Sequence, residues 1–68
     1  MDRTLILAQG KALALLAAML QRGGIIDASE FGNLLGIYAV TVAETEPDQG
    51  DILAVWAGIV RDSADLDG

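Results

Sequence analysis

Apolar residues recur along the chain at intervals of three and four, which is the spacing of one face of an α-helix. The pattern begins near residue 4 and is interrupted twice, at Gly23-Gly24 and around Pro47. It predicts three helices over residues 4–22, 28–45 and 48–63, followed by a frayed acidic tail over residues 64–68. Because short connections make neighbouring helices fold back on one another, we expect an all-α domain, a three-helix bundle with up-down-up topology.

The first predicted helix is rich in Ala and Leu and is apolar around most of its circumference. Six residues share one face at helical spacing: Leu5, Ala8, Ala12, Leu15, Leu16 and Met19. Leu13, Ala17 and Leu20 lie round the side of that face. An apolar arc of this width exceeds what one neighbouring helix can cover, so we expect this helix to be packed on two sides.

The strongest boundary signals lie between the first and second helices, in residues 23–31. Gly23 suits the left-handed residue that often ends a helix. Asp27 suits the N-cap of the second helix, and Glu30, three residues later, would complete a capping box. Ile25 takes no part in these caps, and we expect it to be buried against the end of the first helix or on the third.

Residues 24–31 also resemble the second half of an EF-hand loop, with its glycine, its Ile-Asp pair and its Glu-Phe pair. The resemblance implies calcium bound through Glu30. That family also takes oxygen ligands from the first, third and fifth loop positions, which here are Met19, Gln21 and Gly23. Met19 offers no oxygen ligand and Gly23 has no side chain. We therefore expect these residues to cap a helix, and we expect no metal and no cofactor.

Composition limits how so short a chain can be stable. It has 68 residues, no Cys and no His, and 53% of the residues are hydrophobic. Disulfides are excluded and a structural zinc site nearly so, whereas a domain of this size is marginal as a monomer. The excess of apolar residues indicates surface that a partner covers. We therefore expect dimerisation to complete the bundle.

Five large residues are the candidates for that interface. They are Leu13, Leu16, Leu20, Tyr38 and Trp56. Tyr and Trp are favoured where one end of a side chain is buried and the other meets water. For Tyr38 and Trp56 the alternative is a place in the core, because both lie on helical apolar stripes.

The balance of charge limits the kinds of partner. A net charge of −6 opposes binding to nucleic acid and to anionic membranes. Residues 28–44, the candidate recognition helix of a helix-turn-helix, contain no Lys or Arg. The apolar run over residues 5–20 spans roughly 24 Å as a helix, less than the ~30 Å of a bilayer core. We expect no nucleic-acid partner, no membrane partner and a cytoplasmic location.

The lack of His and Cys removes the commonest general base and the strongest nucleophile, so we do not expect an enzyme. Our leading hypothesis is a small helical protein-interaction module that forms a homodimer and could also bind another protein. The alternative is a protein that binds an apolar small ligand, such as a lipid or acyl group, in a pocket between helices or protomers.

Overall fold

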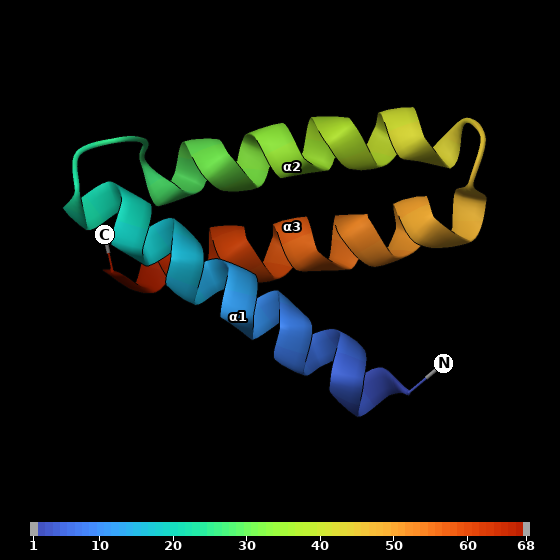
Figure 1. Cartoon of the computed structure of the whole chain (residues 1–68), viewed down its shortest axis with the longest axis horizontal. Helices are drawn as coiled ribbons and strands as arrows, with labels where there is room; N and C mark the ends of the chain where they lie inside the picture. Colours follow the sequence, from blue (N-terminus) through green and yellow to red (C-terminus); the bar gives the residue numbers. More distant parts are fainter. Residues whose placement is uncertain (1, 68) are drawn as a thin grey trace.

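The computed structural model consists of three α-helices joined by two short loops (Figure 1). It describes residues 2–67, and the side chains of residues 2–64. The helices are α1 (Arg3–Arg22), α2 (Ala28–Ala43) and α3 (Pro47–Asp67). The helices pack against one another and the described residues form no strand, which confirms the predicted all-α three-helix bundle.

The three helices are arranged in a flattened, open form of the bundle. α2 and α3 lie side by side as an antiparallel hairpin, and α1 crosses α3 obliquely (Figure 1). α1 packs mainly on α3, and its N-terminal half diverges from the hairpin. The Cα positions extend over 33 × 24 × 16 Å, and the radius of gyration of 11.8 Å exceeds the about 11 Å expected for this length.

Small residues make up the core. The buried hydrophobic residues are Ala14, Ala17, Ala28, Ala39, Ala57 and Val60. Val60 is the largest fully buried side chain within residues 2–64. Because the hydrophobic contribution scales with the apolar area removed from water, a core of alanines stabilises the chain only modestly. Close approach of the helices therefore defines the fully buried part of the core, and the larger Leu13, Phe31, Leu35 and Ile59 pack against it while only partly buried.

Two glycines bring α2 and α3 together. A methyl group on Gly50 would lie 2.7 Å from the Cα atom of Ala43 and 2.9 Å from the carbonyl oxygen of Ala39. A methyl group on Gly32 would lie 3.3 Å from the backbone nitrogen of Arg61 and 3.4 Å from the carbonyl oxygen of Ala57, and it would displace the Arg61 side chain. At Gly50 backbone meets backbone, so the hairpin could not close as tightly there with any larger residue, whereas the contact at Gly32 is less tight.

The end of α1 is a Schellman turn that uses Gly24. Gly24 has a φ of 72°, whereas Gly23 has a φ of −78° and is still right-handed, so the left-handed residue falls one position later than predicted. The Gly24 N–H donates to the Gln21 carbonyl and the Ile25 N–H to the Leu20 carbonyl, both at 3.0 Å. The backbone of Ile25 is held by that hydrogen bond without burial of its side chain, which is 73% exposed. The predicted burial of Ile25 is therefore wrong.

The start of α2 is capped from the preceding helix. Asp27 occupies the N-cap position, as predicted, but its side chain makes no capping hydrogen bond. Instead, the Ala28 N–H donates to Oε1 of Gln21, in the last turn of α1, at 2.7 Å. The predicted capping box needs the Asp27 bond and is therefore not formed. Glu30 is an exposed acid of the first turn, where its charge favours the positive end of the helix dipole.

Four helix ends differ from the prediction, two of them slightly: α2 ends at Ala43 instead of residue 45, and α3 begins at Pro47 instead of residue 48. α1 begins at Arg3 because the Asp2 carboxylate accepts a 2.9 Å hydrogen bond from the backbone N–H two residues later. α3 continues to Asp67 instead of ending at residue 63. Ala64 packs against the core cluster, which favours continuation of the helix. The predicted frayed tail over residues 64–68 is thus wrong for residues 64–67, and residue 68 lies outside the described part.

A pair of glycines in α3 tests the role of close approach. We expect Gly50→Ala to lower the free energy of unfolding by about 1–3 kcal/mol, because the new methyl group meets backbone that cannot move aside. Gly58 has open space around it, so Gly58→Ala should raise stability by up to about 1 kcal/mol through helix propensity. Urea unfolding followed by circular dichroism measures both changes, and equal effects of the two substitutions would contradict this account.

The cap of α2 allows a similar comparison. Gln21→Ala should lower the free energy of unfolding by about 1 kcal/mol, because it leaves the first N–H of α2 without its acceptor. Asp27→Ala should cost less, since no hydrogen bond of its side chain is lost. Chemical denaturation of both variants gives the order, and Gln21→Glu, which keeps an acceptor oxygen, is the control. A larger loss of unfolding free energy for Asp27→Ala than for Gln21→Ala would contradict this account and show that Asp27 does cap α2.

Candidate functional site: an exposed apolar face

Large apolar side chains lie on the outside of the protein. Within residues 2–64, eleven of them are exposed: Leu5, Leu7, Leu15, Leu16, Met19, Ile25, Leu34, Ile37, Tyr38, Val40 and Val55. They come from all three helices and from the first loop. Scattered exposed apolar residues are normal in soluble proteins, so what matters is whether they form a continuous surface.

The longest continuous set is on α1, and we call it the α1 stripe. It consists of Leu5, Ala8, Ala12, Leu15, Leu16 and Met19, and all six are exposed. The opposite side of the helix, with Gly10, Ala14 and Ala17, is the buried one. In the single chain the expectation that α1 is packed on two sides is therefore wrong. A glycine and two alanines lie on the buried side, whereas the large Leu5, Leu15, Leu16 and Met19 face outward.

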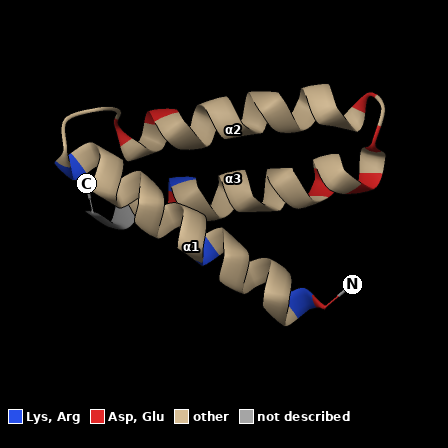
Figure 2. Cartoon of the chain, viewed as in Figure 1, with Lys and Arg blue, Asp and Glu red and all other residues tan. Residues whose placement is uncertain are grey.

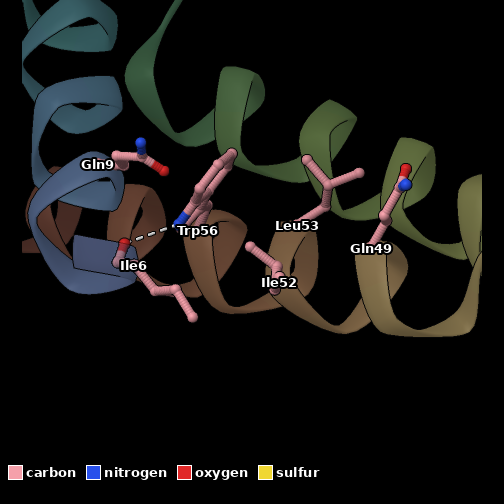
Figure 3. Close-up of a pocket in the computed structure, with 6 residues that line it drawn as sticks. All are labelled: Ile6, Gln9, Gln49, Ile52, Leu53 and Trp56. Carbon is pink, nitrogen blue, oxygen red and sulfur yellow. Dashed lines mark hydrogen bonds between the residues drawn. The ribbon is translucent and has the colours of Figure 1, made fainter. Parts of the chain in front are cut away.

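Trp56 of α3 fixes the N-terminal half of α1. Its indole Nε1–H donates to the carbonyl oxygen of Ile6 at 2.8 Å (Figure 3). A methyl group on Gly10 would lie 3.0 Å from Cδ1 of Trp56 and 2.5 Å from Cδ1 of Ile59, so the bare glycine lets both side chains approach. Trp56 is half-buried, and its single hydrogen-bond donor is satisfied. The rest of the indole is apolar and makes no further hydrogen bond.

Two adjoining hollows flank Trp56. The first has a volume of about 280 Å³ and is lined by Ile6, Gln9, Gln49, Ile52, Leu53 and Trp56 (Figure 3). The second has a volume of about 340 Å³ and is lined by Gln9, Ala12, Leu13, Leu16 and Trp56. Gln9 and Trp56 line both hollows, while Ala12 and Leu16 also belong to the α1 stripe. The stripe and the hollows therefore form one apolar surface.

The five predicted interface residues fall into two groups. Leu16 and Tyr38 are exposed, by 46% and 58%. Leu13, Leu20 and Trp56 are half-buried, and Leu13 packs against the core cluster. The structure brings Leu13, Leu16 and Trp56 together around the second hollow. Sequence reasoning did not select the other large members of the α1 stripe, because spacing does not tell which side of an all-round apolar helix is buried.

The residues that resemble an EF-hand loop form the turn between α1 and α2. The Gln21 amide oxygen, at the third loop position, accepts the hydrogen bond from Ala28. Asp27 and Glu30 are exposed. Across the described residues there is no group of three or more His, Cys, Asp or Glu side chains that could hold a metal ion. Gln21 thus serves to join two helices.

Most charged residues lie near the helix ends and the loops, and Lys11 lies in the middle of α1 (Figure 2). Residues 12–21 of α1 and 31–43 of α2 carry no charge. By length and composition α1 could cross a membrane, with a mean hydropathy of 1.5. The same length and composition occur in core helices of soluble proteins and in signal sequences.

Comparisons with known proteins found no match to a protein-family model, to a curated protein or to a solved structure. The function is therefore inferred from the surface of the chain itself.

Proposed function

We propose that this protein is a small interaction module that acts as a homodimer. The observation that carries the proposal is the exposure of eleven large hydrophobic side chains around a core whose largest fully buried side chain, within the described residues, is Val60. Continuous apolar patches of more than a few hundred Å² mark interaction sites in soluble proteins. The chain therefore has the surface of a protein that binds a partner.

The amount of exposed surface fits a dimer. The chain exposes 4749 Å², whereas a compact monomer of 7.1 kDa would expose about 4,100 Å². The difference of roughly 650 Å² is close to the ≈ 800 Å² that each partner buries in a standard interface. Covering by one further copy would give each protomer the exposure of an ordinary folded protein.

The role we propose is one of binding rather than catalysis, in the cytoplasm and without a nucleic-acid or membrane partner. The net charge of −6 supports this, because it disfavours phosphate backbones and anionic lipid headgroups. Charged residues near the helix ends also favour the solubility of the protomer before it associates with a partner.

Sedimentation equilibrium at micromolar concentration tests the proposal. We expect a mass of twice 7.1 kDa for the wild-type chain. Leu16→Glu should give a folded monomer, because Leu16 is exposed and its substitution places a charge in the interface. Leu13→Glu should unfold the chain, because Leu13 packs on the core. Circular dichroism of each variant separates these outcomes, and a stable wild-type monomer would refute the homodimer.

The two hollows beside Trp56 favour a second candidate function, binding of an apolar small ligand. Their volumes of about 280 and 340 Å³ lie just below and just above the lower limit of the ≈ 300–1,000 Å³ range of ligand pockets. Apart from Gln9 and Gln49, the side chains that line them are apolar. A lipid or acyl chain would suit this lining.

Native mass spectrometry of protein purified from its own host distinguishes the two functions. A ligand-binding protein should carry a co-purifying mass, and Trp56→Ala should lose it because the indole lines both hollows. A dimer without any added mass would support the interaction module alone.

A further inference from the structure

We infer that the α1 stripe is the surface through which two copies of the chain meet, with the two α1 helices antiparallel and crossing at Ala12. The inference rests on the proposed homodimer and specifies its interface. Four observations carry it: the continuity of the stripe, its length, the order of side-chain sizes along it, and the hollow beside its centre.

Continuity favours α1 over α2 as the interface. α2 also exposes large apolar side chains, including Leu34, Ile37 and Tyr38. At helical spacing, however, Glu30 and Thr41 lie among them, and the Thr41 hydroxyl is held to the α2 backbone by a 3.3 Å hydrogen bond. The six residues of the α1 stripe are all apolar, and the exposed Gln9 borders them at helical spacing. A partner would thus bury charge or hydroxyl on α2, whereas on α1 it would bury apolar groups and one neutral amide at the edge.

The α1 stripe is long enough for a stable helix pair. Leu5 to Met19 spans about 21 Å along the helix axis, or four turns. Within the part of the chain that the structure describes, no other element covers the stripe over this length, because α1 contacts α3 with its opposite side. A second α1 could therefore lie along all of it without displacing a contact within the protomer.

The order of sizes along the stripe favours an antiparallel pair. In such a pair centred on Ala12, the small Ala8 faces the partner's Leu16, and Leu5 faces the partner's Met19. The small Ala8 then meets a large side chain instead of its own copy, which fills the space between the helices more evenly. In a parallel pair Ala8 would face its own copy while the bulky second halves of the stripes met, and one end would be held apart. The opposed helix dipoles also favour the antiparallel pair.

The hollow beside the crossing point fits the same arrangement. Ala12 and Leu16 border it on α1, and Trp56 borders it on α3. A partner helix that crosses at Ala12 would pass over this hollow. Side chains along the edge of the partner helix would then fill the hollow. The antiparallel pair thus covers the stripe and the apolar face of Trp56 together.

Single cysteines test the arrangement cleanly, because the chain has none of its own. At a crossing on Ala12 the two Cβ atoms come within disulfide range, so Ala12→Cys should form a disulfide-linked dimer under mild oxidation. Leu5→Cys and Met19→Cys should each remain unlinked, whereas their equimolar mixture should link. The control is Val40→Cys, which is exposed on α2. We expect it to link roughly tenfold more slowly than Ala12→Cys, since only the latter thiols are held together.

Each other outcome overturns the inference. Self-linking of Leu5→Cys and of Met19→Cys would show a parallel pair. Equal rates for Val40→Cys and Ala12→Cys would show that the stripe is not the interface. A wild-type dimer in which no α1 cysteine links would refute the interface but leave the homodimer standing, whereas a wild-type monomer would refute both. Flotation with phosphatidylcholine vesicles, with loss of the Ala12→Cys disulfide, would assign the stripe to a membrane surface.

Discussion

Close approach of α3 to both of its neighbours is the constraint on which this structure depends. Gly50 brings α3 against the backbone of α2, and Gly10 brings α1 against Trp56 and Ile59. Contacts of this kind require small residues on the facing sides. Since α1 and α2 are apolar nearly all round, their large side chains are left on the outer sides. The single chain therefore buries its smallest apolar residues and exposes many of its largest, and association with a second copy would correct that imbalance.

The sequence was enough to predict the number, type and order of the elements. Helical periodicity is strong in every segment, and Gly24 and Pro47 mark breaks that no helix could cross unchanged. It was not enough to predict the side on which α1 is buried. On a helix that is apolar all round, hydrophobicity does not indicate which side is buried. The side of α1 that packs on α3 is the one with the small residues Gly10, Ala14 and Ala17.

The same distinction between local and spatial information explains the other differences. Asp27 and Glu30 carry the local signals of a capping box, but the acceptor that reaches α2 is Gln21, seven residues before Ala28. For the candidate site, too, only part could be predicted from the sequence. Composition alone indicated exposed apolar surface, whereas its position on α1 and its continuity with the hollows at Trp56 depend on how the helices cross.

The hydrogen bond from Ala28 to Gln21 has a dynamic consequence. The first N–H of a helix usually points into solvent, but here its acceptor belongs to the last turn of the helix before it. Fraying of either helix end breaks this bond, so the opening of one end weakens the other. The deuterium exchange rate of the Ala28 amide therefore reports the order of the end of α1 as well as the start of α2. Any partner that stabilises the end of α1 would therefore slow exchange at the Ala28 amide, across a loop of five residues.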